Sequence, residues 1–172
     1  RAITVVVQPS ELKAALDALP KPRLVVTDSQ AFKAVDAIVP QDIQLTSFSI
    51  LFARYKGELE TVAAGAEAIA RLISEGCTHH RQCNDIGSVK LPGWIGNYTG
   101  KKLNYEFTSG GEFPESLDKY ALIVHCGGCM LTAREMKYRL RHARDCGVPI
   151  TNYGIAIAKM HGILDRSLEP FN

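Results

Sequence analysis

A strand, a helix and a second strand follow one another in the second half of the chain, and this order constrains the fold more than any other feature. The run "ALIVH" at residues 121–125 predicts a buried strand, "TAREMKYRLRHARDC" at 132–146 predicts an amphipathic helix, and "VPITNY" at 148–153 predicts another strand. Thr132 and Glu135 stand at the spacing of a helix-capping box. Strands joined through a helix run parallel, so we expect an α/β protein.

The first half repeats this order. We expect strands at residues 3–7, 23–29 and 43–48, with helices after the first two of them, and "SILFARYKGELETVAAGAEAIARL" at 49–72 predicts two helices or one bent helix. The chain as a whole predicts two small Rossmann-like parallel-sheet units with three layers. Any ligand site is expected at the rim formed by the carboxyl ends of the strands.

The sequence between the two units predicts its secondary structure less clearly. Residues 77–102, "CTHHRQCNDIGSVKLPGWIGNYTGKK", show no sustained period and predict a long functional loop. Just before it, "EAIARLISEG" passes from a helical pattern to a strand pattern with no turn residue, so we expect residues to be missing near Leu72.

Composition narrows the class of protein. The chain has 172 residues with 46% apolar and 22% charged residues, which is typical of a soluble globular protein. A net charge of +2 is too small to indicate nucleic acid or an anionic membrane as a partner. No apolar run is long enough to span a bilayer and no secretory signal is present, so we expect a cytoplasmic protein. Thiols stay reduced there, so five cysteines indicate metal or redox chemistry.

Three cysteines are expected at one rim. Cys77 and Cys126 end two predicted strands, and Cys129 precedes the helix capped by Thr132, whose dipole favours thiolates. The two glycines between Cys126 and Cys129 allow the backbone to approach an inorganic centre. Three thiolates fit an iron-sulfur cluster with one iron left for another ligand. His79 and His125, each near one of these cysteines, are candidates for that ligand or for its surroundings.

Two other functions remain open on the residues alone. Cys126 and Cys129 could form the redox pair of a thiol-disulfide oxidoreductase, although this explains neither Cys77 nor the histidines. Cys77, His79, Cys126 and Cys129 could also hold zinc in an interaction domain. The pattern favours a metal centre over a bare dithiol. It supports an iron-sulfur cluster and a zinc ion equally. We interpret Cys83 and Cys146 as ordinary thiols.

These motifs also resemble those of a known family. The spacing Cys77-x-His79 followed by His125-Cys126-x-x-Cys129, together with "TDSQAF", "TSFSILFARYKG", "HCGGCM" and "VPITNYGIAIAKMHGIL", is similar to the C-terminal part of the HydF family of FeFe-hydrogenase maturation GTPases. The resemblance runs along nearly the whole chain and favours iron-sulfur over zinc.

The resemblance implies a scaffold protein with two domains. Residues 1–71 would be a dimerisation domain, truncated at its start, and residues 72–172 a domain that binds a 4Fe-4S cluster through Cys77, Cys126 and Cys129. Members of the family accept a diiron precursor with CO and cyanide ligands, assembled with two radical-SAM maturases, and pass it to apo-hydrogenase. A homodimer is expected. The fourth iron ligand stays open, with Cys83, Asp85, water and a small molecule beside the two histidines.

The chain departs from the family in its GTP site. The nearest segment to a phosphate-binding loop, "GNYTGKK" at residues 96–102, has one residue too few between its glycines and carries Lys102 where Ser or Thr should bind magnesium. We therefore expect no GTPase activity, and no other catalytic motif is recognised.

Two helical faces complete the predictions. Lys137, Arg141 and Arg144 form a basic stripe, interpreted first as a solvated face and second as a docking face for a partner or for the anionic precursor. An aromatic and apolar face on the preceding unit is interpreted first as core and second as a dimer contact. It consists of Phe48, Leu51, Phe52 and Tyr55.

Overall fold

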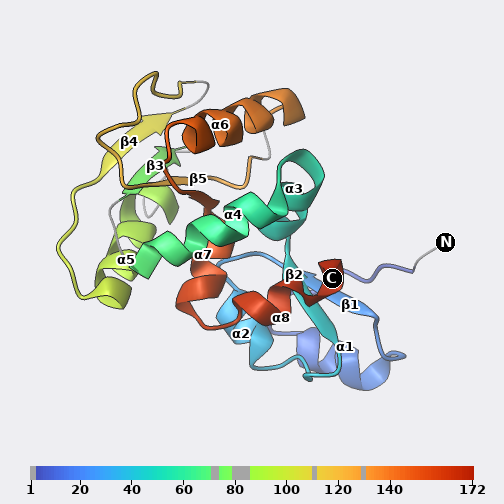
Figure 1. Ribbon diagram of the computed structural model, residues 1–172. Helices are drawn as coiled ribbons and strands as arrows, with labels where there is room; N and C mark the ends of the chain where they lie inside the picture. Colours follow the sequence, from blue (N-terminus) through green and yellow to red (C-terminus); the bar gives the residue numbers. More distant parts are fainter. Residues whose placement is uncertain (1–2, 71–73, 79–85, 110–111, 129–130) are drawn as a thin grey trace.

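Two parallel β-sheets form the framework of the protein (Figure 1). The computed structural model describes residues 3–70, 74–78, 86–109, 112–128 and 131–172. A two-stranded sheet pairs β1 (Leu24–Thr27) with β2 (Gln44–Ser47). A four-stranded sheet has the order β4-β3-β5-β6, with β3 at Ser74–Thr78, β4 at Glu106–Ser109, β5 at Leu122–His125 and β6 at Ile150–Asn152. Every described pair is parallel, which confirms the predicted α/β class.

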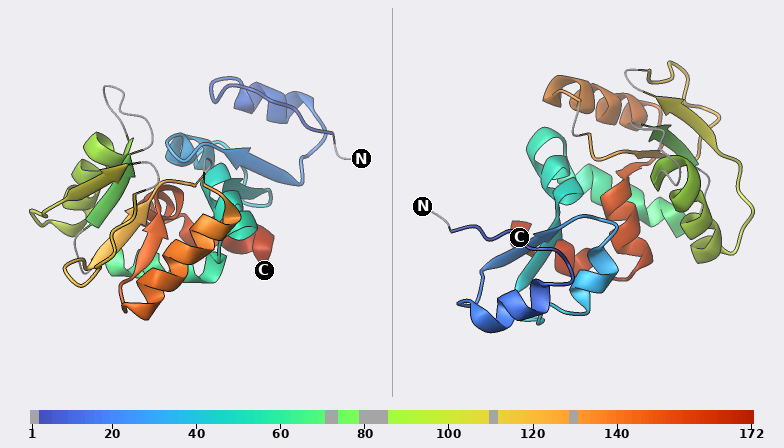
Figure 2. Two further views of the ribbon diagram at one scale, coloured as in Figure 1. Left: turned by 90° about the horizontal axis from the view of Figure 1, so that it is seen from above. Right: turned by 180° about the vertical axis from the view of Figure 1, so that it is seen from behind.

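Helices cover both faces of the larger sheet. Figures 1 and 2 show α6 on one face and α4, α5 and α7 on the other, which gives three layers. The α-helices of the described residues are α1 (Leu12–Ala18), α2 (Phe32–Asp36), α3 (Phe48–Lys56), α4 (Leu59–Ala66), α5 (Leu91–Thr99), α6 (Ala133–Asp145), α7 (Tyr153–Met160) and α8 (Leu164–Leu168). Three short helical turns are η1 (Glu67–Ala70), η2 (Ile86–Lys90) and η3 (Glu169–Phe171).

Three helices start at a polar cap that follows a strand. The side chains of Ser47, Thr132 and Asn152 accept hydrogen bonds from backbone amides three residues later, at 3.4, 3.2 and 2.9 Å. Ser47 and Asn152 are themselves the last residues of β2 and β6, so each strand passes directly into a helix. These caps satisfy amides that have no partner inside the helix, which fixes the point where the chain turns at the carboxyl ends of the strands.

The segment 49–72 contains two helices, as predicted. α3 ends at Lys56, Gly57 follows it with a non-helical backbone, and α4 begins at Leu59. The predicted core face of α3 is wrong, because Phe48 is 54% and Tyr55 is 85% exposed while Ile50 and Ala53 face the interior. The periodicity identified the helix but selected the wrong side of it.

Two further predictions of local structure are wrong. Residues 3–7 form no strand in the described chain, although their sequence is rich in β-branched residues. The expected loop at 77–102 contains α5, where Pro92 fits the first turn and Leu91 and Ile95 are buried. Gly93 and Gly96 weakened the helical signal in the sequence. Leu72, where residues were expected to be missing, lies outside the described residues.

The C-terminal residues return to the first sheet. α8 packs against β2, and Thr46 donates a hydrogen bond to the carbonyl of Ser167 at 2.9 Å. Arg166 reaches the segment between α2 and β2 with several hydrogen bonds. The C-terminal residues, which follow the last strand of the larger sheet, therefore pack against the smaller one. Within the described residues, no helix combines the length and the apolar character needed to cross a membrane.

Candidate metal centre

The ends of β3 and β5 bring two of the predicted cysteines to the same rim. β3 pairs with β5 in parallel, and the register places Gly76 opposite Val124. Cys77 is the next residue on β3, and Cys126 directly follows the last residue of β5. The expected juxtaposition of these two chain positions at the carboxyl edge is therefore present, which is where open parallel sheets bind ligands. The side chain of Cys77 is outside the described part of the structure.

The loop after β5 is shaped by its two glycines. Cys126 is buried, and Gly128 has a φ of +70°, which glycine adopts without the strain that a side chain would cause. A Cβ on Gly128 would overlap the terminal methyl of Met136 on α6. A Cβ on Gly127 would stand 3.3 Å from the hydroxyl of Ser49 on α3. Gly127 and Gly128 therefore lie close to α3 and α6, and a side chain at Gly128 would also strain its backbone.

The remaining candidate ligands fall outside the described residues. These are Cys129, His79, Cys83 and Asp85. Among the residues that the structure describes, no three His, Cys, Asp or Glu side chains lie close enough to hold a metal ion. Cys146 is half-buried just after the far end of α6, with its sulfur 3.9 Å from Nδ1 of His142. This position supports its interpretation as an ordinary thiol.

His125 is a buried histidine with an available ring nitrogen. Only 2% of its surface is exposed, and burial lowers its pKa to about 4, with a smaller contribution from the positive charge of Arg139. The imidazole is therefore neutral near pH 7. Nδ1 contacts the carbonyl oxygen of Cys126, which can only accept, so Nδ1 carries the proton. Nε2 then has a lone pair, and it has no hydrogen-bond partner among the described residues.

This arrangement fits a metal ligand or a close neighbour of one. A neutral imidazole whose other nitrogen donates to a carbonyl is the usual state of a ligating histidine. An unpartnered buried nitrogen costs free energy unless another group satisfies it. Together with two cysteine positions at one rim and a glycine loop that approaches closely, the residues present fit an iron-sulfur or zinc centre.

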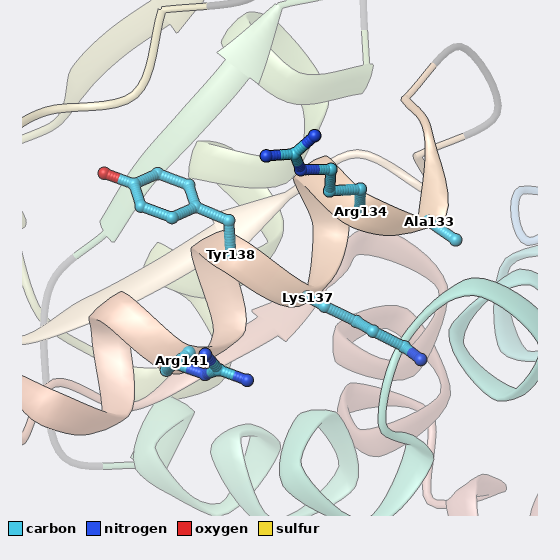
Figure 3. A pocket seen from close by; sticks show the side chains of 5 residues that line it. All are labelled: Ala133, Arg134, Lys137, Tyr138 and Arg141. Atoms are coloured by element: carbon cyan, nitrogen blue, oxygen red, sulfur yellow. The ribbon is translucent and has the colours of Figure 1, made fainter.

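The predicted basic stripe lies on the exposed side of α6. Figure 3 shows Arg134, Lys137, Tyr138 and Arg141, which with Ala133 line a shallow hollow beside the start of the helix. Arg144, the third member of the stripe, forms an exposed ion pair with Glu58 at 3.4 Å. The outer side of α6 therefore carries several basic side chains along its length, while Met136, Leu140 and Ala143 are buried on its inner side.

Lys56 is a residue near the centre that sequence reasoning missed. Its ammonium group contacts the loop between Cys126 and Thr132, although about seventy positions separate them in the chain. A lysine at the end of an amphipathic helix has no local signal that distinguishes it from a solvated one. Only the packing of α3 against α6 places it there.

The fold and the candidate centre define the class of protein: an α/β protein in which two cysteine positions and a buried histidine lie at the carboxyl ends of adjacent parallel strands. Two family models cover nearly the whole chain. The model described as the Hydrogen maturase F dimerization domain matches residues 1–57, and the model described as the Hydrogen maturase F tetramerization domain matches residues 59–170. The chain therefore belongs to the hydrogen maturase F family, HydF, which confirms the predicted resemblance.

The matched domains also bear on the other predictions. They are domains of self-association and not the catalytic domain of the family, which supports an oligomeric protein. The two models meet between residues 57 and 59, at the break between α3 and α4. No curated protein matches the chain.

Proposed function

We propose that this chain binds a 4Fe-4S cluster through Cys77, Cys126 and Cys129 and serves as a carrier in hydrogenase maturation. The observation that carries the proposal is the position of Cys77 and Cys126 at the ends of two adjacent parallel strands. Cys129 comes two residues after the close-packed Gly127. Membership of the hydrogen maturase F family favours an iron-sulfur cluster over zinc.

The residues around the centre would each have a defined task. The three thiolates would bind three irons, and the start of α6 would stabilise their negative charge. His125 would offer Nε2 as the fourth ligand or lie beside it, and His79 is the alternative. When bound, the cluster would supply one iron without a cysteine ligand, which can exchange its ligand.

The cargo in this proposal is a diiron precursor with CO and cyanide ligands. The chain would receive it with the help of radical-SAM maturases and transfer it to apo-hydrogenase in the cytoplasm. Lys137 and Arg141, exposed on α6, would favour an anionic cargo near the rim. An exchangeable iron is suited to this task because the cargo must be held and then released.

The same proposal assigns no GTPase activity to this chain. The segment "GNYTGKK" occupies the end of α5 and its cap, with Gly100 at a φ of +66°. A phosphate-binding loop instead follows a strand and precedes a helix, so that backbone amides surround the phosphates. Measurable GTP turnover by the isolated chain would contradict this part of the proposal.

The test is anaerobic reconstitution with iron and sulfide, followed by iron analysis and EPR of the reduced protein. We expect a cubane signal in the wild-type chain that is lost in Cys77→Ser and in Cys129→Ser but retained in the matched variant Cys146→Ser. Failure to take up iron, together with retained zinc, would instead indicate a zinc-stabilised interaction domain. A reversible Cys126–Cys129 disulfide with reductase activity that survives Cys77→Ser would indicate an oxidoreductase. Activation of apo-hydrogenase by the loaded chain then tests transfer.

A further inference from the structure

The positive charge of this chain is concentrated on one helix. α6 carries five Lys or Arg and two Asp or Glu residues, a net charge of +3, whereas the whole chain has a net charge of +2. The rest of the chain is therefore slightly acidic. Glu135 is engaged by the buried Arg139 at 2.7 Å, so it does not offset the exposed cations. Figures 1 and 2 show α6 as the outer layer on its side of the larger sheet.

Three cations of α6 have no acidic partner in the part of the chain that the structure describes. Arg134, Lys137 and Arg141 are exposed, and none of them forms an ion pair with a described residue. Arg144, which the sequence placed in the same stripe, is instead paired with Glu58 at 3.4 Å. Like charges three or four positions apart destabilise a helix, and an acidic partner would offset this repulsion.

These cations line a groove whose shape suits a second helix. The hollow in Figure 3 has a volume of about 550 Å³ and is lined by two rows of side chains, in each of which the members are four positions apart. One row consists of Ala133, Lys137 and Arg141, and the other consists of Arg134 and Tyr138. The groove between two such rows is where the side-chain ridge of another helix packs.

The directions of the side chains favour an extended partner over a small anion. Figure 3 shows Arg134 and Lys137 pointing away from each other, whereas a site for one small anion needs cations that converge. Seven positions separate Arg134 from Arg141, which corresponds to about 10 Å along the helix axis. The complementary acidic groups are therefore spread over a similar length. A duplex nucleic acid is bound by more cations over a wider surface, so an acidic protein element fits better.

Tyr138 supplies an aromatic contact in the middle of this surface. It is 54% exposed, and its ring stacks on that of His142, with 5.8 Å between the centroids and 8° between the planes. Nε2 of His142 contacts the backbone oxygen of Glu115 at 2.9 Å. The tyrosine ring is thus held in place before a partner binds, which lowers the entropic cost of binding. Tyrosine and arginine are among the residues that contribute most to the energy of protein interfaces.

We propose that the outer face of α6 is a docking surface for an acidic amphipathic helix of a partner protein. This face consists of Ala133, Arg134, Lys137, Tyr138 and Arg141. Carboxylates on the partner helix pair with the three cations, and its apolar side chains pack against Tyr138. The inference goes beyond the proposed function and requires no bound cluster, because all of its residues lie on α6. Its failure is therefore distinct from a failure to bind iron.

The test measures the binding of two synthetic helical peptides to the metal-free chain by fluorescence anisotropy and stopped flow. One peptide carries glutamates and leucines in neighbouring rows, and the other has glutamine in place of every glutamate. The first variant of the chain reverses three charges, Arg134→Glu, Lys137→Glu and Arg141→Glu. Its matched control makes the same change at exposed lysines outside α6, Lys33→Glu, Lys101→Glu and Lys102→Glu. Urea denaturation of each variant separates loss of binding from loss of folding.

We expect the wild type to bind the acidic peptide at low salt, with an affinity that falls as salt is added. The glutamine peptide should bind about tenfold more weakly or less. Charge reversal on α6 should lower the association rate constant about tenfold, because complementary charge mainly accelerates association. Tyr138→Ala should instead accelerate dissociation about tenfold, because it removes the packed anchor. The lysine control should match the wild type.

Three kinds of result would overturn the inference. Equal binding of both peptides, no binding of the acidic one at low salt, or an equal loss in the lysine control would show that the face does not select acidic helices. Tighter binding of an RNA duplex or of phosphatidylserine vesicles, lost on charge reversal, would assign the face to nucleic acid or to a membrane. A lower molecular mass of the charge-reversed variant in light scattering would show that a second copy of this chain occupies it.

Discussion

Gly65 on α4 lies directly against the backbone of Ile150 on β6. An ideal Cβ on Gly65 would overlap the carbonyl oxygen of Ile150 and would stand 2.6 Å from its carbonyl carbon. Thr151 strengthens this contact by donating a hydrogen bond to the carbonyl of Val62 at 2.8 Å. Backbone atoms on both sides cannot move aside independently. We therefore expect Gly65→Ala to lower the free energy of unfolding by about 2–3 kcal/mol, measured by urea denaturation.

Gly93 on α5 is the matched control for that substitution. It is also helical, but a Cβ there would meet nothing within 4 Å. Alanine is a better helix former than glycine by about 0.5–1 kcal/mol, so Gly93→Ala should leave stability unchanged or increase it. If both variants lost the same free energy of unfolding, the contact between α4 and β6 would not explain the effect of Gly65→Ala.

The part of the fold that was predicted best is the strand, helix and strand around the candidate centre. β5, α6 and β6 follow the expected pattern because the apolar periodicity and the Thr132 cap agree. α5 was missed because its glycines obscured a short apolar periodicity. The valine-rich residues 3–7 were misassigned because β propensity alone does not supply a partner strand.

His125 should make the metal-free chain sensitive to acid. Burial lowers its pKa from 6.5 to about 4 in the folded state, so between these values the unfolded chain binds more protons. Above pH 6.5 the neutral His125 therefore imposes no loss on the free energy of unfolding. As the pH decreases toward 4, this group lowers the free energy of unfolding by about 3 kcal/mol. Urea denaturation at pH 7, 5.5 and 4.5 in the presence of a chelator measures the loss.

The variant His125→Gln isolates this contribution. Glutamine does not titrate, while the carboxylates of the chain respond to pH in both proteins. The difference in unfolding free energy between wild type and variant should therefore shrink from pH 7 to pH 4.5. An identical dependence on pH in the two proteins would contradict the burial of a neutral imidazole.

Arg166 should contribute strongly to the attachment of α8. It binds Asp36 at 2.5 Å and the carbonyl oxygens of Val39, Pro40 and Ile43 at 3.0, 2.6 and 3.2 Å. The group is nearly buried, so its removal leaves several acceptors without a donor. We expect Arg166→Met to cost about 3 kcal/mol in urea denaturation. Arg166→Lys should restore little, because an ammonium cannot reproduce the planar donor set.

The control for this prediction is Arg144→Met on α6. Arg144 pairs with Glu58 at 3.4 Å, and both side chains are largely exposed. Exposed ion pairs contribute about 0–1 kcal/mol, so this variant should remain close to wild type. If Arg144→Met and Arg166→Met lowered the free energy of unfolding equally, the buried hydrogen bonds of Arg166 would not be the reason for its contribution.

The candidate site could be predicted only in part, and the physical reason is distance along the chain. Cys126 and Cys77 were placed at one rim because both follow from the strand pattern and from the parallel topology. Lys56 and Gly128 meet only through tertiary packing of α3 against α6, which no local pattern encodes. The assignment of Cys77, Cys126 and Cys129 as iron ligands stays a prediction.

The exposed residues before α1 should take part in self-association. Ile3 is 95% and Val6 is 91% exposed, within the segment matched by the dimerization domain. Among the described residues β1 pairs only with β2, so its other edge can accept a strand from a second copy. We expect Ile3→Lys combined with Val6→Lys to lower the molecular mass in solution, measured by light scattering. Gln8→Lys combined with Gln41→Lys adds the same charge at exposed polar positions and should leave the mass unchanged. An unchanged mass in the first variant would show that association uses other surfaces.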